Sequence, residues 1–156
     1  MARKVFIDGD VGTTGLQIRE RLERRGDVAL VRIDPSLRKD IPARLAAFAE
    51  AEVAILCLPD AAAKEVVAAC DAAGLSTRII DASTAHRTHP DWCFGFAEMA
   101  PDQRAAISRA TRVTNPGCWS TCAIALIRPL VDAGLIDPAQ PPAISGVSGY
   151  SGGGKA

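Results

Sequence analysis

The stretch that decides the fold is KVFIDGDVGTTGL, residues 4–16. Its first five residues, Lys4–Asp8, form a short β-rich run, and three closely spaced glycines follow. Apolar residues among charges then recur at helical spacing over Gly15–Arg25, which predicts a helix with one buried face. A strand, a glycine turn and a helix in this order are typical of the first half of a βαβ unit.

The glycines of this turn have the spacing of a phosphate-binding loop. Gly9, Gly12 and Gly15 read GxxGxxG, one residue longer in the first gap than the usual GxGxxG. Such glycines let the chain turn sharply, let the backbone approach a pyrophosphate and let the helix pack on the sheet. Thr13 and Thr14 add hydroxyl donors. The pattern predicts a dinucleotide-binding loop; a glycine turn without a ligand is the alternative.

The same alternation continues along most of the chain. Further strands are expected over Val28–Ile33, Val53–Leu58, Arg78–Asp81 and Arg112–Thr114, and further helices over Ile41–Ala51 and Ala61–Ala73. Residues 84–110 lose the pattern and are expected to form a long loop with short helical pieces. The sequence therefore predicts an α/β, doubly wound (Rossmann-like) fold with a mostly parallel sheet and helices on both faces.

The end of the chain looks like the start of a second unit. A proline-rich linker precedes an apolar run at Ala143–Val147, which reads as a strand and leads into glycines. We expect residues 1–140 to be an NAD(P)-binding Rossmann-like domain that includes the cysteine helix. Residues 141–156 are then expected to begin a truncated second α/β domain with its first strand.

Composition excludes several classes of function. Lysine plus arginine equals aspartate plus glutamate at 18 each, and aromatic residues make up only 4% of the chain, which argues against nucleic acid as a partner. No apolar run approaches the length of a membrane span or of a signal-peptide core, so a cytoplasmic protein is expected. The five cysteines are odd in number and lack a CxxC pair, which argues against a disulfide framework and against a metal site.

The residues after the second expected strand bear on the choice between NAD and NADP. Asp34 is placed to bond a ribose 2′-hydroxyl, as in NAD-binding proteins, whereas Ser36, Arg38 and Lys39 could hold the 2′-phosphate of NADP. We favour NADP; a solvated basic turn is the alternative.

A candidate nucleophile lies in NPGCWSTC, residues 115–122. The turn signal Asn115–Gly117 is followed by a run that predicts a helix ending near Gly134, so Cys118 lies at its first turn. Unpaired N–H groups and the helix dipole favour a thiolate there. A structural thiol is the alternative.

The C-terminal segment Gly149–Ala156 nearly matches the phosphate loop GxxxxGK[ST] of nucleotide triphosphatases. The hydroxyl residue that such a loop needs on magnesium is replaced by Ala156. An ATPase is therefore disfavoured.

Taken together, six ordered motifs resemble the N-acetyl-gamma-glutamyl-phosphate reductases, most closely their shorter form, within the semialdehyde dehydrogenase superfamily. They are GDVGTTG (residues 9–15), CLPD (57–60), DASTAHR (81–87), FGFAE (94–98), NPGC (115–118) and SGVSGYSGGGK (145–155). Aspartate-semialdehyde dehydrogenases, from the same superfamily, share the glycine loop and a cysteine helix, but GYSGGGK (residues 149–155) points to the reductase.

The resemblance implies a reaction of arginine biosynthesis. A thiolate, here at Cys118, attacks the acyl phosphate of N-acetylglutamyl 5-phosphate, and hydride from NADPH converts the resulting thioester to N-acetylglutamate 5-semialdehyde. It also implies a homo-oligomer and an acid–base histidine, which neither His86 nor His89 matches. Both are expected to be solvated loop histidines, and the chain alone is expected to turn over slowly or not at all. The alternatives are a non-catalytic NADP-binding module and a related aspartate-semialdehyde dehydrogenase.

The resemblance further implies two sets of ligand-binding residues. Those near the substrate are Ser83, Arg87, Glu98, Ser148, Gly149 and Tyr150. Those that line the adenosine pocket are Cys57, Leu58 and Pro59. Around Glu98 the family pattern has a tyrosine and a proline where this chain has Phe94 and Ala97.

Overall fold

The computed structural model describes residues 2–149. The chain divides into two units, Met1–Gly117 and Cys118–Ala156. The first unit holds the sheet, and the second holds one long helix and the segment that follows it. The predicted boundary at residue 140 stays a prediction.

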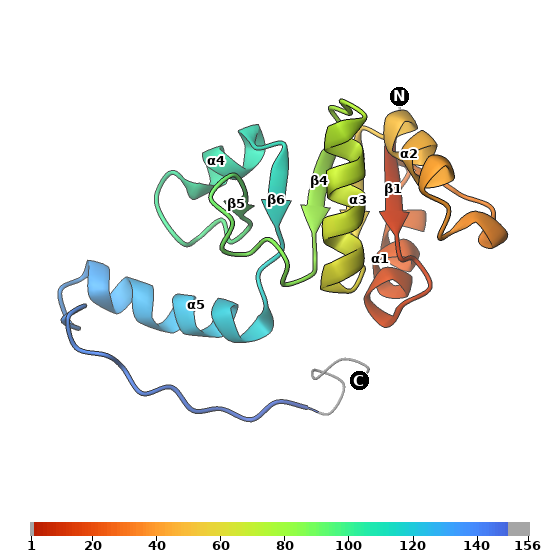
Figure 1. The fold of residues 1–156 in the computed structure, drawn as a ribbon. Helices are drawn as coiled ribbons and strands as arrows, with labels where there is room; N and C mark the ends of the chain where they lie inside the picture. The colour runs from red at the N-terminus through yellow and green to blue at the C-terminus, as the bar shows by residue number, and fades with distance from the viewer. Residues whose placement is uncertain (1, 150–156) are drawn as a thin grey trace. The chain divides into compact units, whose positions relative to one another are not determined.

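Six parallel strands form the sheet of the first unit (Figure 1). They are β1 (Arg3–Asp8), β2 (Val28–Val31), β3 (Val53–Leu56), β4 (Arg78–Asp81), β5 (Cys93–Phe94) and β6 (Arg112–Thr114), in the order β2-β1-β3-β4-β6-β5. The parallel α/β fold is confirmed, and five of the strands lie where the sequence predicts them. The two-residue strand β5 was not predicted, because so short a run carries no periodicity.

Helices connect these strands. They are α1 (Thr13–Glu23), α2 (Ile41–Glu50), α3 (Asp60–Ala72) and the short α4 (Gln103–Arg109), with one 3-10 turn, η1 (Pro35–Leu37). Asp40 starts α2 by accepting a hydrogen bond from the backbone N–H of Ala43 at 2.8 Å. The strand order reverses on either side of β1, so right-handed crossovers place α1 on one face and α2 and α3 on the other.

The core lies between the sheet and the helices α2 and α3. Phe6 of β1 meets Phe48 of α2 edge to face, with ring centroids 5.3 Å apart. Leu56, Val66 and Ile79 are fully buried beside them. Removing this apolar surface from water stabilises the sheet and fixes the positions of the strand ends.

The five strands that the sequence predicts are parallel to one another, so their carboxyl ends lie at the same edge of the sheet. The loops that leave this edge begin with Gly9 after β1, Arg32 after β2, Cys57 after β3, Ala82 after β4 and Asn115 after β6. Four of the six motifs begin in or next to these loops, and a fifth, FGFAE, begins at Phe94, the last residue of β5. In open α/β sheets ligands bind outside the carboxyl ends of the strands, where the strand order reverses.

The second unit contains α5 (Cys118–Asp132), and Gly134 follows it with a positive φ of 70°. The predicted helix is confirmed. The strand predicted at Ala143–Val147 is wrong: residues 141–149 of the described chain have no regular secondary structure. An isolated apolar run forms a strand only when a neighbouring strand accepts its backbone hydrogen bonds.

Over residues 2–149, none of the helices combines the length and the apolar character that a membrane span requires. The same residues contain no group of three or more histidine, cysteine or acidic side chains arranged to hold a metal ion.

Candidate functional site

Two of the three glycines in the loop after β1 are required by packing. Gly9 has φ +90°, and a Cβ placed on it would lie 2.4 Å from the carbonyl oxygen of Cys57. A Cβ on Gly15 would lie 2.1 Å from the carbonyl oxygen of Gly9. A Cβ on Gly12 would meet that same oxygen at an ordinary 3.5 Å. Gly12 is therefore not required by packing within this chain.

The loop leads directly into the N-terminus of α1. Gly12 is its N-cap residue, and within the described chain no side chain caps it and no acidic residue lies in its first turn. Thr13 and Thr14 are exposed there. A helix N-terminus left in this state favours an anion through its N–H groups and its dipole.

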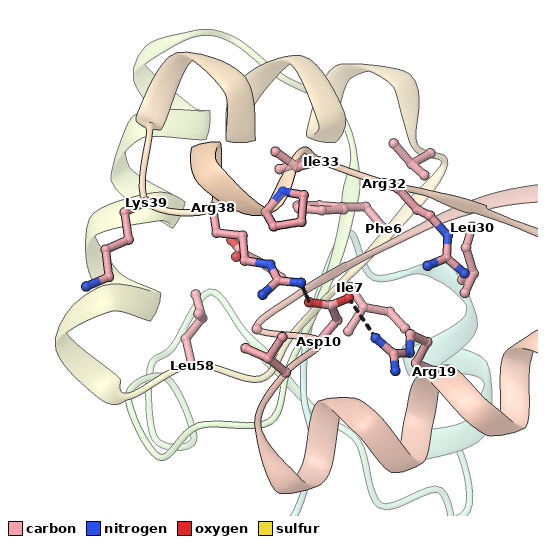
Figure 2. A pocket seen from close by; sticks show the side chains of 15 residues that line it. Phe6, Ile7, Asp10, Arg19, Leu30, Arg32, Ile33, Arg38, Lys39 and Leu58 are labelled. Atoms are coloured by element: carbon pink, nitrogen blue, oxygen red, sulfur yellow. Dashed lines mark hydrogen bonds and ion pairs between the residues drawn. The ribbon is translucent and has the colours of Figure 1, made fainter.

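A cavity of about 380 Å³ lies beside this loop (Figure 2). Its walls come from β1, the glycine loop, α1, β2 with the turn after it, and Leu58. Of the predicted cofactor residues, Gly9, Arg38 and Leu58 line it. The other predicted cofactor residues lie in or next to the same loops without lining the cavity: Gly12, Thr13, Thr14, Gly15, Ser36, Cys57 and Pro59.

The charges on the cavity wall are mostly positive. Basic side chains come from Arg19, Arg32, Arg38 and Lys39. The Nε atom of Arg19 is buried and has no hydrogen-bond partner among the described residues. Its ion-pair partner Glu23 lies 3.8 Å away, too far for a hydrogen bond. A buried guanidinium N–H without a hydrogen bond is unusual in folded proteins, and an anionic ligand would supply the acceptor.

Asp34 caps a short helical turn through its side chain. Its Oδ1 accepts hydrogen bonds from the backbone N–H of Ser36 at 2.8 Å and from the Ser36 hydroxyl at 2.5 Å, which caps the turn η1. These bonds, led by the one from the hydroxyl, lower the pKa of Asp34. Asp34 is absent from the cavity wall, so the acidic group typical of NAD-binding proteins is used to start a helical turn.

A buried ion pair lies under the glycine loop. Asp8 ends β1, and its Oδ2 accepts hydrogen bonds from Nε and Nη2 of Arg44 at 2.9 Å and 2.6 Å. Both side chains are almost fully buried. Burial raises the pKa of Asp8, and the Arg44 guanidinium opposes that rise. Sequence reasoning missed this pair because its partners are 36 residues apart and no local pattern joins them.

The segment after β4 is organised by the buried carboxylate of Asp81. Its Oδ1 accepts from the backbone N–H of Ser83 at 2.9 Å, and its Oδ2 accepts from the Ser83 hydroxyl at 2.7 Å. His86 Nδ1 lies 2.6 Å from the same Oδ2, and the His86 ring stacks on Trp92 with centroids 4.2 Å apart. The prediction of a solvated His86 is therefore wrong, because the carboxylate and the indole bury it. His89 is exposed, as predicted.

Arg87 follows this segment and turns its guanidinium onto Gly117. Its Nη1 lies 2.6 Å from the position that a Cβ on Gly117 would take. Its Nη2 donates to the carbonyl oxygen of Ala82 at 3.4 Å, and its buried Nε has no partner among residues 2–149. Arg87 is thus a half-buried cation against the residue that precedes Cys118.

The remaining predicted substrate residues lie in different surroundings. Glu98 is exposed and pairs with Arg104 at 2.9 Å. Ser148 and Gly149 belong to the second unit, where the Ser148 hydroxyl donates to the carbonyl oxygen of Gly149 at 3.4 Å. Tyr150 lies outside the described residues.

The cysteines differ in exposure and in acidity. Cys118 and Cys122 on α5 are exposed. Cys70 is buried in the core, and burial raises its pKa to about 11. Burial, with a smaller effect of the Asp8 and Asp81 charges, also raises the pKa of Cys57 to about 11. A thiol with such a pKa is almost wholly protonated at neutral pH and is a poor nucleophile.

Two protein-family models match the chain. The semialdehyde dehydrogenase NAD binding domain matches residues 4–107, and the semialdehyde dehydrogenase dimerisation domain matches residues 118–156. These matches fall on either side of the division between the two structural units at Gly117.

Curated proteins are similar to the chain in sequence, and solved structures are similar to it in fold. N-acetyl-gamma-glutamyl-phosphate reductases of Brucella ovis and Brucella suis are 54% identical over 99% of this chain. The chain spans about half the length of these relatives. An aspartate semialdehyde dehydrogenase from Francisella tularensis superposes over 85% of this chain and 41% of its own with a TM-score of 0.65 and 17% identity. An aspartate semialdehyde dehydrogenase from Candida albicans, solved with NADP, superposes over 87% of this chain and 48% of its own, with a TM-score of 0.57 and 16% identity.

Proposed function

The chain belongs to the semialdehyde dehydrogenase family, and from this premise we propose that it carries the cofactor site and the nucleophile of an NADP-dependent N-acetyl-gamma-glutamyl-phosphate reductase. The observation that carries the proposal is the 54% identity to reductases of that name along nearly the whole chain. The solved aspartate semialdehyde dehydrogenases share the fold at 16–17% identity, which gives no ground for transferring their substrate.

The cofactor in this proposal is NADP. Gly9, Gly12 and Gly15 with the N-terminus of α1 hold the pyrophosphate, and Arg38 with Ser36 binds the 2′-phosphate. Two features support the fit: the buried Nε of Arg19 on a basic cavity wall, which makes no hydrogen bond within the described residues, and the use of Asp34 as a helical cap. When bound, NADPH supplies the hydride that brings the acyl group to the aldehyde level.

The nucleophile in this proposal is Cys118. Its Sγ forms a bond to the acyl carbon of the substrate while the bond from that carbon to the phosphate oxygen breaks, which leaves a thioester on Sγ and releases inorganic phosphate. Cys118 is the first residue of α5, and its side chain is exposed to an incoming substrate. Arg87 and Ser83 bind the charged groups of the substrate, and Glu98, Ser148, Gly149 and Tyr150 border it, as the family resemblance implies.

Two further statements belong to this proposal and rest on the resemblance. The protein acts in the cytoplasm on a small acyl phosphate, and it self-associates. The chain alone is expected to complete few turnovers, because neither of its histidines matches the family's acid–base residue.

Acylation of Cys118 tests the proposal without requiring full turnover. The chain is mixed with N-acetylglutamyl 5-phosphate, released phosphate is measured, and the intact mass is recorded. We expect about one phosphate per chain and one N-acetylglutamyl adduct on the parent. Cys118→Ser should lose both, and Cys122→Ser, which removes the other exposed thiol of α5, should keep both. An adduct that persists in Cys118→Ser would refute the assignment, and absence of any adduct would favour a non-catalytic NADP-binding module.

Binding of NADPH tests the cofactor. Titration of the parent and of Arg38→Ala should show at least tenfold weaker binding in the variant, since a charge-assisted contact to the phosphate is lost. Equal affinity in the two proteins would remove the reason for preferring NADP over NAD.

A further inference from the structure

Asp10 is an acidic residue at the centre of the basic cavity wall. Figure 2 shows its carboxylate between the guanidinium groups of Arg19 and Arg38. Oδ2 lies 3.3 Å from Nη1 of Arg19, and Oδ1 lies 3.7 Å from Nη2 of Arg38. The glycine loop, α1 and the segment after β2 therefore each contribute one charged group to a single cluster.

The carboxylate satisfies these two arginines poorly. Charge-assisted hydrogen bonds between guanidinium and carboxylate groups are normally about 2.7–2.9 Å long, so the 3.3 Å contact is long and the 3.7 Å contact is an ion pair only. Arg19 also keeps its buried Nε without a hydrogen-bond partner in the described part of the chain. Arg19 and Arg38 share the Asp10 carboxylate in a site that is only about one quarter to two fifths exposed. Arg19 has one further anion nearby, because Glu23 Oε1 lies 3.8 Å from its Nε, a distance too long for a hydrogen bond.

The other charged groups near the cavity do not give the Nε of Arg19 a hydrogen bond, since the Glu23 oxygen nearest to it is held by Arg32. Arg32 pairs with Glu23 at 2.7 Å, and Asp8 is bound by Arg44. Lys39 adds a further positive charge to the wall. A dianion that reached Arg19 and Arg38 would therefore meet two arginines whose contacts to carboxylates are long, and it would be repelled by the Asp10 carboxylate between them.

We propose that Asp10 is a built-in counter-ion that competes with the 2′-phosphate of the cofactor for Arg19 and Arg38, so that Asp10 and Arg19 together set how strongly the site prefers a 2′-phosphate to a 2′-hydroxyl. The inference rests on the proposed NADP site. It adds Arg19 as a second phosphate-binding arginine and makes Asp10 the residue that limits the preference, since like charges a few Å apart repel strongly in a partly buried site.

Calorimetric titration of the chain with two nucleotides tests this inference. The probes are adenosine 2′,5′-bisphosphate and adenosine 5′-phosphate, which differ only in the 2′-phosphate. Asp10→Asn should raise the affinity for the bisphosphate about tenfold and leave that for the monophosphate within about twofold. Arg19→Gln should lower the affinity for the bisphosphate about fivefold or more.

Matched controls separate a local effect from a change in net charge. Asp27→Asn and Arg25→Gln remove the same charges from an exposed ion pair outside the cavity and should change neither affinity. Asp10→Ser, a smaller neutral substitution, should repeat the gain seen with Asp10→Asn, and thermal melting confirms that each variant is folded.

The outcomes are distinct. If folded Asp10→Asn and Asp10→Ser bind the bisphosphate no more tightly than Asp27→Asn does, the counter-ion inference is overturned while the NADP site stands. If Arg19→Gln binds as the parent does, the part assigned to Arg19 is overturned. If the parent and the Asp10 variants bind neither nucleotide, the proposed cofactor site fails and the inference fails with it.

Discussion

His86 and Asp81 form a buried pair in which Nδ1 of the imidazole lies 2.6 Å from Oδ2 of the carboxylate. Trp92 covers the other side of the ring by stacking on it. The pair connects the end of β4 to the loop that carries Ser83 and Arg87, two of the residues assigned to the substrate. His86, which lies in an irregular segment, therefore stabilises the loop that carries Ser83 and Arg87.

Replacement of His86 should destabilise the protein. His86→Ala removes a hydrogen bond to a charged group and a stacked ring, and we expect the free energy of unfolding in urea to fall by about 2–3 kcal/mol. His89→Ala, at an exposed position of the same loop, should change it by less than about 0.5 kcal/mol. Equal stability of the two variants would show that the buried pair contributes nothing.

Substitutions of Gly15 and Gly12 should separate the role of a glycine in packing from its role in ligand binding. Gly15→Ala places a Cβ 2.1 Å from a carbonyl oxygen of the loop, so we expect a loss of more than about 2 kcal/mol in the free energy of unfolding. Gly12→Ala meets nothing closer than 3.5 Å and should unfold within about 0.5 kcal/mol of the parent. Urea unfolding measures both, and NADPH titration should show weaker binding by Gly12→Ala. A Gly15→Ala variant as stable as the parent would contradict the close approach of the loop to α1.

The buried pair of Asp8 and Arg44 should behave as one unit. Arg44→Leu leaves the Asp8 carboxylate buried without its partner, and we expect a loss of about 3 kcal/mol or more. The double variant Asp8→Asn with Arg44→Leu removes both charges and should recover part of that loss in the same urea unfolding experiment. Losses that simply add would contradict an interaction between the two residues.

The alkylation rates of the four cysteines Cys57, Cys70, Cys118 and Cys122 should depend on pH in different ways. With iodoacetamide at pH 8, Cys118 and Cys122 should react about 100-fold faster than Cys57 and Cys70, because thiols with a pKa of about 11 are almost wholly protonated there. Below its pKa a thiol gains thiolate about tenfold per pH unit, so the rates at Cys57 and Cys70 should still rise above pH 9.

Peptide mass spectrometry assigns each rate to its residue, and Cys118 is expected to be the fastest site. A plateau at Cys57 below pH 9 would contradict its raised pKa. A rate at Cys118 equal to that at Cys122 would indicate that the first turn of α5 does not activate the thiol in this chain.

The sequence by itself determined the parallel α/β fold, the glycine loop and the helix that begins at Cys118. These features depend on neighbours along the chain: apolar runs, the spacing of Gly9, Gly12 and Gly15, and the turn before α5. The tertiary structure alone decided the buried His86, the pair of Asp8 with Arg44 and the place of Asp10 between Arg19 and Arg38. Those contacts join residues whose separation along the chain follows no repeating pattern, and only the packing of β1, its neighbouring strands and their loops brings them within reach of one another.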